Sequence, residues 1–169
     1  KRVLVTCGTH LKWEKERMVE RAKKLSQLYP DYLFYVTLGE ASGLENPPHR
    51  LAENLLLFDY LPYTDILDKI DFAIHHAGTG IMMACIEQEI PSLILPQDYD
   101  QFDNAVRAEL AQVGLVARRK TDAEVLRLFK ELTNRTDWSH LKTLAQKSKE
   151  YQPTEILYQE LGRLLKLDL

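Results

Sequence analysis

Short apolar runs alternate with helix-like segments along most of this chain, and this alternation limits the folds that it can adopt. The first run, residues 2–7, does not alternate between polar and apolar side chains, which is typical of a strand buried on both faces. Strands and helices that follow each other in turn predict a mostly parallel sheet in a three-layer α/β/α arrangement. About six strands are expected, at residues 2–7, 32–38, 54–58, 71–75, 92–95 and 115–117.

The helical segments are bounded by recognisable signals. Residues 13–29 carry apolar side chains at helical spacing and stop before Pro30. Residues 101–113 place Phe102, Val106, Leu110 and Val113 on one face, and Gly114 is expected to end that helix. The glycine- and proline-containing stretch 43–48 predicts an irregular loop. We predict one domain over residues 1–169 that ends in a helical tail, residues 139–169, with helices at 139–149 and 154–167.

Composition excludes several classes of partner. A net charge of −3 lacks the basic footprint of a nucleic-acid-binding protein. No apolar run approaches the roughly 20 residues of a transmembrane helix, and we find no signal peptide before the first strand. Cys7 and Cys85 each lie in an apolar segment, so we expect buried free thiols in a reducing compartment and a cytoplasmic location. Lys1 in place of an initiating Met suggests a segment of a longer protein.

Candidate binding loops follow the expected strands. They are residues 8–10, 39–41, 60–63, 76–80 and 97–104. Because the carboxyl ends of parallel strands lie at one edge of a sheet, and ligands bind at that edge in such folds, we expect these loops to form one site.

The sequence His-Ala-Gly-Thr-Gly at 76–80 lies directly before an expected helix. Free backbone N–H groups and the helix dipole make such a position suitable for an anion. Gly78 and Gly80 would let a phosphate approach the backbone without a β-carbon in the way. The alternative is a plain turn between strand and helix, because the segment is neither a Walker loop nor a GxGxxG fingerprint.

Two patterns raise the possibility of a metal ion. His75 and His76 are adjacent, but neighbours on an extended segment point to opposite faces, so we expect His75 in the core and His76 at the ligand edge. Asp98-Tyr99-Asp100 resembles the Asp-x-Asp of metal-dependent sugar transferases. The longer pattern Pro96-x-x-x-Asp100-Gln101-x-x-Asn104-Ala105 favours a different match, so no metal is predicted. No Ser-His-Asp or Cys-His set is recognisable, and no catalytic residue is assigned.

Residues 58–105 resemble the donor-binding signature of glycosyltransferases with the GT-B architecture, in particular the glucosyl/glucuronosyl and macrolide transferases. The resemblance rests on His76-x-Gly78 and on the Pro96 to Ala105 pattern, and residues 3–9 are similar to the first strand and loop of that family's C-terminal half. It implies a Rossmann-like half of a GT-B fold that binds a nucleoside diphosphate sugar as donor substrate, without a metal cofactor.

The resemblance also implies roles for individual residues. His76 and the backbone of Gly78, Thr79 and Gly80 would hold the diphosphate, with Gly8 and Thr9 near the phosphates. Asp100 and Gln101 would bind hydroxyls of the sugar, Asn104 would support their loop, and Leu61 and Tyr63 would lie against the base. The catalytic base would belong to an N-terminal acceptor-binding half, present in cis or in trans. The isolated domain is therefore expected to be inactive.

Four positions depart from the family's pattern. Ile81 stands where the family has a phosphate-binding Ser or Thr, Ala84 where it has a ribose-binding Glu, Glu89 where it has Gly, and Tyr63 where it has a base-contacting Gln. Glu87, one helical turn beyond Ala84, is a candidate replacement for the missing carboxylate. These departures keep two alternatives open. One is a non-catalytic or split-enzyme subunit that binds and activates another glycosyltransferase chain, and the other is a sugar-nucleotide epimerase.

Overall fold

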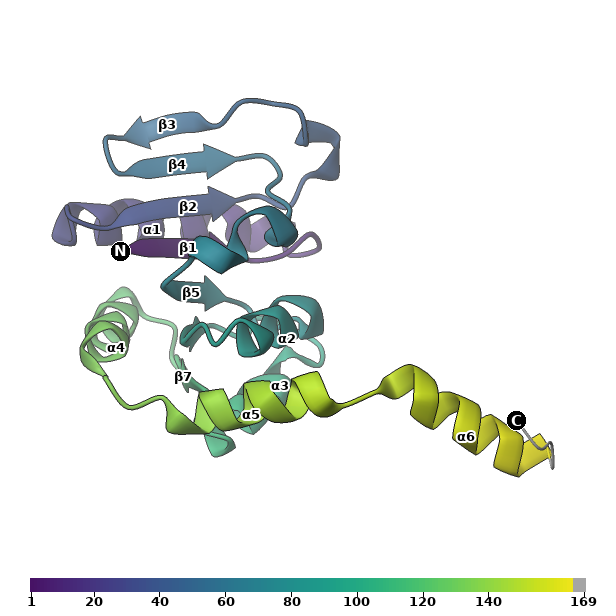
Figure 1. The fold of residues 1–169 in the computed structure, drawn as a ribbon. Coiled ribbons are helices and arrows are strands. Elements are labelled where there is room, and N and C mark those ends of the chain that lie inside the picture. The colour runs from purple at the N-terminus through teal and green to yellow at the C-terminus, as the bar shows by residue number, and fades with distance from the viewer. Residues whose placement is uncertain (166–169) are drawn as a thin grey trace.

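The computed structural model describes residues 1–165, in which a sheet is covered by helices on both faces (Figure 1). Across these residues seven strands pair in the order β3-β4-β2-β1-β5-β6-β7. All neighbouring strands are parallel except β3 and β4. The predicted α/β/α architecture is therefore confirmed. The strands are β1 (Arg2–Thr6), β2 (Leu33–Thr37), β3 (His49–Ala52), β4 (Leu55–Phe58), β5 (Phe72–His75), β6 (Ser92–Ile94) and β7 (Gly114–Val116).

Strand β1 lies at the centre of the sheet, between β2 and β5. Val3, Leu4 and Val5 are at most 2% exposed, which explains the absence of polar alternation in this run. Val3 and Val5 belong to one buried cluster and Leu4 to another. Since successive side chains of a strand point to opposite faces, the two clusters are the cores on the two sides of the sheet.

Six helices occur in the described residues, and all but the last pack on the sheet or on each other. They are α1 (Lys15–Leu28), α2 (Thr79–Glu87), α3 (Gln101–Leu110), α4 (Asp122–Asn134), α5 (Ser139–Glu150) and α6 (Pro153–Leu165), with short 3-10 turns at Lys12–Glu14, Ala41–Gly43, Tyr63–Asp65 and Leu67–Lys69. Helices α1 and α4 contribute Met18, Leu25 and Phe129 to the core that contains Val3. Helix α2 contributes Ile81 and Cys85 to the core that contains Leu4. The two cores are not divided cleanly between the helices, because Ile86 of α2 belongs to the core that contains Val3.

The seventh strand, β3, was not predicted. It follows the glycine- and proline-rich loop and pairs antiparallel with β4, with His49 opposite Leu57 and Arg50 opposite Leu56. All its residues are exposed, so no burial pattern marks it in the sequence. Its backbone hydrogen bonds to β4 define this edge strand, and its side chains contribute little to the core.

Helix α3 is rotated relative to the prediction. Phe102, Val106 and Leu110 are 50%, 43% and 78% exposed, while Gln101, Ala105 and Ala108 face the interior. The expected apolar face is therefore wrong, because the buried contacts of α3 are made by small side chains. The helix also ends at Leu110, before Gly114, which is the first residue of β7.

The helical tail differs between its two parts. Helix α5 buries Leu141 and Ala145, whereas Gly162 is the only buried residue of α6. Figure 1 shows α6 extending away from the sheet. Residues 166 and 167 of the predicted helix, and the end of the predicted tail, lie outside the described residues. Within residues 1–165, no helix has both the length and the apolar character required to cross a membrane.

Candidate functional site

The loops that follow β1, β5 and β6 meet at one edge of the sheet and enclose a surface pocket of about 450 Å³. Five predicted site residues line this pocket, namely His76, Gly78, Thr79, Asp100 and Gln101. The remaining lining residues are Cys7, His10, Leu11, Trp13 and Tyr99. The site is thus at the carboxyl ends of parallel strands, which is where ligands bind in open α/β sheets.

His76 lies between two glycines from different loops. A β-carbon on Gly8 would lie 2.7 Å from His76 Cε1, and one on Gly78 would lie 2.4 Å from Nε2. Burial lowers the pKa of His76, and the backbone of Thr6 and the carboxylate of Asp100 oppose that shift. The imidazole is therefore neutral at pH 7. Among the described residues, its buried Nδ1 atom meets no hydrogen-bond partner.

His75 has a different environment, as the alternation of an extended segment predicts. Its side chain is 2% exposed, and its Nδ1 accepts a hydrogen bond of 3.1 Å from the backbone N–H of Ala77. Burial, and then the neighbouring His76, lowers the pKa of His75 to about 3. Ala77 itself has a positive φ of 70° although it is not glycine. The turn that presents His76 is therefore held in a conformation that L-residues rarely adopt.

Asp100 connects the turn after β5 with the loop after β6. Its Oδ2 accepts hydrogen bonds from Thr79 Oγ1 at 3.3 Å and from Asn104 Nδ2 at 3.0 Å. Asn104 Nδ2 also donates to the carbonyl of Ala77 at 3.0 Å. The two ends of the sequence motif are therefore brought together by direct hydrogen bonds.

Gln101 is turned towards its own loop. Its Oε1 accepts hydrogen bonds from the backbone N–H groups of Gln97, at 3.0 Å, and Asp98, at 3.2 Å. The residue is 6% exposed. The carbonyl oxygen of Gln101 therefore stabilises the loop between β6 and α3, and a contact with a sugar hydroxyl stays a prediction.

The other predicted residues lie along the same sheet edge outside the lining of the pocket. Thr9 Oγ1 lies 3.0 Å from His10 Nδ1, and a β-carbon on Gly80 would meet no atom within 4 Å. The hydroxyl of Tyr63 lies 3.1 Å from Thr6 Oγ1, and the N–H of Leu61 donates to Thr37 Oγ1 at 3.1 Å. Leu61 and Tyr63 thus form an apolar surface beside the ends of β1 and β2.

The departures from the family pattern have structural explanations. Ile81 is 3% exposed in the core beneath α2, and Ala84 packs against the same core as Leu61 and Tyr63. Glu89 has a φ of 56°, a value that favours glycine. The suggested replacement by Glu87 is wrong, because this residue is at the C-terminal end of α2 and contacts Ser148 Oγ at 3.4 Å, away from the pocket.

Sequence reasoning missed several residues that line the pocket. Trp13 and Tyr99 are 62% and 73% exposed, which is unusual for large aromatic side chains in a hollow. His10 and Tyr99 belong to the predicted binding loops 8–10 and 97–104, although neither was singled out as a ligand contact. Trp13 lay outside those loops, because it resembled the start of a helix. Cys7 also borders the pocket, but burial raises the pKa of its thiol to about 11, which keeps it protonated.

The site has no arrangement typical of a metal centre within the part of the chain that the structure describes. There, no three or more His, Cys, Asp or Glu side chains cluster closely enough to hold an ion. Asp98 Oδ1 accepts a hydrogen bond from the N–H of Tyr99 at 2.8 Å, and Asp100 is engaged by Thr79 and Asn104.

Comparison with known proteins places the chain in a family. Residues 36–161 match the model of the C-terminal domain of erythromycin biosynthesis protein CIII-like proteins. Over 99 residues the chain is 32% identical to a sterol 3-beta-glucosyltransferase of Komagataella phaffii, a match that spans 59% of this chain and 8% of that protein. The chain therefore covers only a small part of this relative.

Two solved structures share the fold. The glycosyltransferase of kitacinnamycin superposes with a TM-score of 0.79 at 19% identity, over 96% of this chain and 42% of that one. Spinosyn rhamnosyltransferase SpnG, in complex with thymidine diphosphate, superposes with a TM-score of 0.75 at 18% identity, over 95% and 45%. As the sequence resemblance predicted, this chain belongs to the family of erythromycin biosynthesis protein CIII-like C-terminal domains, and its fold is that of one half of the GT-B architecture.

Proposed function

We propose that this chain binds the nucleoside diphosphate sugar of a glycosyl transfer reaction in the pocket between His76 and Asp100. The observation that carries the proposal is the joining of these two groups in one pocket at the N-terminus of α2. A diphosphate and a sugar need an anion site and a hydroxyl acceptor at a short distance, and this pocket offers both.

The diphosphate would lie against the first turn of α2. The first intrahelical bond, from Met82 N to Gly78 O at 3.0 Å, leaves the N–H groups of Thr79, Gly80 and Ile81 without helical acceptors. These N–H groups and the helix dipole attract an anion, and the open space at Gly80 admits it. A neutral His76 can donate one further hydrogen bond. Together these groups would stabilise the diphosphate as it leaves the sugar.

The sugar and the base would lie on opposite sides of the diphosphate. Asp100 would accept hydrogen bonds from sugar hydroxyls, while Leu61 and Tyr63 would pack on a uracil or thymine ring. SpnG has been solved with thymidine diphosphate, which supports a pyrimidine base. Ala84 cannot hydrogen-bond the ribose, so affinity for the nucleoside should be lower than in relatives that carry a carboxylate there.

The acceptor and the catalytic base would come from an N-terminal half, in the same polypeptide or in a separate one, and this chain alone would transfer no sugar. We propose a metal-independent reaction, because the pocket offers helix N–H groups and His76 for the charge that a cation would otherwise neutralise. A cytoplasmic location is consistent with the two buried free thiols, Cys7 and Cys85.

Titration of the chain with UDP, TDP, UDP-glucose and TDP-glucose tests the proposal. A ligand that binds only the folded state adds about 2.7 kcal/mol to stability at a hundred times its Kd, so Tm should rise with at least one of the four. The His76→Asn variant should weaken binding by about tenfold or more, as the loss of a charge-assisted hydrogen bond does. His140→Asn, an exposed histidine on α5, is the control. Absence of any shift at millimolar nucleotide would reject the proposal.

A second candidate function is that of a non-catalytic partner of another glycosyltransferase chain. The burial of Ile81 and the apolar packing of the partly buried Ala84, where the family has polar ligand contacts, favour it. Under this reading, native mass spectrometry of the assembled protein would show the chain bound to a separate transferase polypeptide. The same titration would then show no nucleotide binding by this chain.

A further inference from the structure

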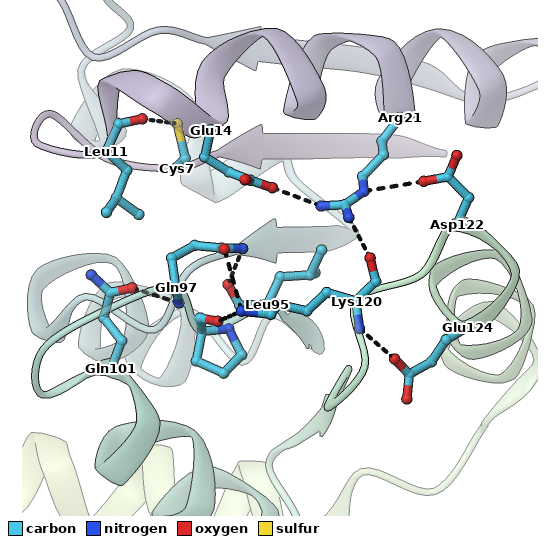
Figure 2. A network of polar contacts seen from close by, with 11 residues as sticks. Cys7, Leu11, Glu14, Arg21, Leu95, Gln97, Gln101, Lys120, Asp122 and Glu124 are labelled. Atoms are coloured by element: carbon cyan, nitrogen blue, oxygen red, sulfur yellow. Dashed lines mark hydrogen bonds and ion pairs between the residues drawn. The ribbon is translucent and has the colours of Figure 1, made fainter.

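The loop that carries Asp100, residues 96–100, is held in its first half, residues 96–98, by the side chain of Gln101 and by a lysine from a distant segment. Gln101 Oε1 accepts from the N–H groups of Gln97 and Asp98. From the other side, Lys120 Nζ donates to the carbonyl of Pro96 at 2.8 Å and to Gln97 Oε1 at 3.4 Å (Figure 2). Gln97 Nε2 in turn donates to the carbonyl of Leu95 at 3.0 Å. The first half of the loop is thus fixed by side-chain hydrogen bonds from two directions.

Lys120 lies in the segment between β7 and α4 and is itself held in place. Its φ of 54° is in the left-handed region. Its N–H donates to Glu124 Oε2 at 2.7 Å, and its carbonyl accepts from Arg21 Nη2. This backbone geometry aims the lysine stem at the Pro96 carbonyl, and the ammonium lies 5.4 Å from the centre of the Phe102 ring. A cation over an aromatic face is attracted to it, which limits the orientations of the side chain.

Arg21 connects this arrangement to α1. Its side chain is 7% exposed and forms ion pairs with Glu14 at 2.9 Å and Asp122 at 3.5 Å (Figure 2). A buried arginine with two carboxylates and a carbonyl acceptor has a fixed position, because movement of the guanidinium would weaken charge-assisted hydrogen bonds in a buried site. The contacts therefore run from α1 through Lys120 to the loop that presents Asp100.

We propose that Lys120 is a positioning residue, which orients the 96–100 loop without touching the ligand. Residues that line the pocket come from the loops after β1, β5 and β6, and Lys120 is not among them. The backbone N–H groups that donate to Gln101 can keep their geometry only if Pro96 and Gln97 stay in place. The ammonium of Lys120 holds these two residues with a hydrogen bond roughly twice as strong as one between neutral groups. The expected effect of Lys120 on sugar binding rests on the proposed function, whereas its expected effect on the geometry of the loop does not.

Three variants separate positioning from general stability. Lys120→Met keeps an unbranched stem of similar length but removes the ammonium, both as donor to Pro96 and as the cation over Phe102, while Lys120→Arg restores a cationic donor. Lys130→Met removes an exposed lysine from α4 and is the control. In the ligand-free chain, amide hydrogen exchange of Gln97 and Asp98 should become about tenfold faster in Lys120→Met. It should return towards the original rate in Lys120→Arg and stay unchanged in Lys130→Met. Unchanged exchange in Lys120→Met would overturn the proposal.

The same variants are then titrated with UDP and UDP-glucose, and with TDP and TDP-glucose. Lys120→Met should bind the sugar nucleotide about tenfold more weakly and bind the free diphosphate within about twofold of the unmodified chain, because only the sugar reaches the 96–100 loop. An equal loss for both ligands would contradict a positioning role. If the unmodified chain binds none of the four ligands but the exchange pattern holds, the proposed function fails and the role of Lys120 in the loop stands.

Discussion

At the scale of single residues, the position of His76 depends on two neighbouring glycines, which have no β-carbon to collide with its ring. Gly8 and Gly78 leave space on two sides of the imidazole, and Gly8 also has a φ of 73°. Gly80, two residues further on, faces open space. The three glycines of these loops therefore have different roles: the first two accommodate the ring, and the third leaves the helix N-terminus accessible.

Substitution of Gly78 by alanine should move His76. The added methyl would lie 2.4 Å from Nε2, a distance that neither group can keep, so we expect a loss of about 1–3 kcal/mol of stability. Gly80→Ala is the matched control in the first turn of α2, where alanine should be neutral or stabilising by up to about 1 kcal/mol. Thermal unfolding of the two variants checks the difference. Equal Tm values would show that the ring relaxes without cost.

A site residue could be found from the sequence when its role depends on residues close to it in the chain. His76, Gly78 and Asp100 belong to a linear motif, and the predicted site contains all three. The inward turn of Gln101 and the burial of Ile81 depend on contacts with segments far away in the chain, so spacing alone cannot reveal them. Trp13 and Tyr99 line the pocket only because the loops after β1 and β6 are neighbours in the folded sheet.

At the scale of elements, α2 and α3 end in the same way. Beyond α2, Ile90 N donates to Cys85 O and Glu89 N to Ile86 O; beyond α3, Val113 N donates to Ala108 O and Gln112 N to Glu109 O. This pair of bonds is the Schellman motif, whose left-handed residue is usually glycine. Here that residue is Glu89 in one helix and Gln112 in the other, each with a φ of 56°.

Replacement of Gln112 by glycine should stabilise the protein. A left-handed L-residue costs about 1–2 kcal/mol, and the extra freedom of glycine in the unfolded chain offsets roughly half of that, so a net gain of about 0.5–1 kcal/mol is expected. Ala111→Gly, at a φ of −75°, has no strain to relieve and should lower stability instead. Chemical denaturation of both variants measures the two signs. A destabilised Gln112→Gly variant would contradict the prediction.

Two elements were predicted wrongly, the end of α3 and the strand β3, and each error has its own physical cause. The end of α3 was assigned to Gly114 because glycine commonly follows a helix, but a glutamine occupies the left-handed position and Gly114 begins β7. A β-carbon on Gly114 would lie 3.0 Å from the carbonyl of Ser92, so this glycine serves the close packing of two strands. The strand β3 escaped prediction because its residues are exposed, and hydrophobic patterns report only buried surfaces.

At the scale of the whole molecule, the mostly parallel sheet with helices on both faces was predictable because buried parallel strands have a strong sequence signal, whereas the order of the strands in the sheet was not predicted. One consequence of this burial is a pH dependence at the centre of the fold. His75, at the end of β5, is neutral in the folded protein with a pKa of about 3, against a usual value of 6.5. Its contribution to stability is therefore complete above pH 6.5 and declines as pH falls from 6.5 towards 3, where the unfolded chain binds a proton and the folded chain does not.

Acidification should destabilise the protein through His75 before the carboxylates titrate. Between pH 6.5 and 5 we expect a loss of about 1.5 kcal/mol of stability, at up to 1.36 kcal/mol per pH unit. His75→Asn, whose side-chain oxygen can still accept from the N–H of Ala77, should lose most of this slope and keep the part that comes from His76, whose pKa burial also lowers. The exposed His140→Asn should keep the full slope. Urea denaturation across this pH range compares the three proteins. An identical slope in His75→Asn would assign the effect to other groups.

The central position of β1 has a kinetic consequence. Its partner β2 follows within about thirty residues, but its other partner β5 begins at Phe72, so a long loop must close before the sheet is continuous. The pocket is made of loops from β1 and from β5 and β6, on the two sides of that late junction. An intermediate that holds only the β4-β2-β1 half of the sheet would have no pocket. Binding of a nucleotide would therefore report that folding has finished.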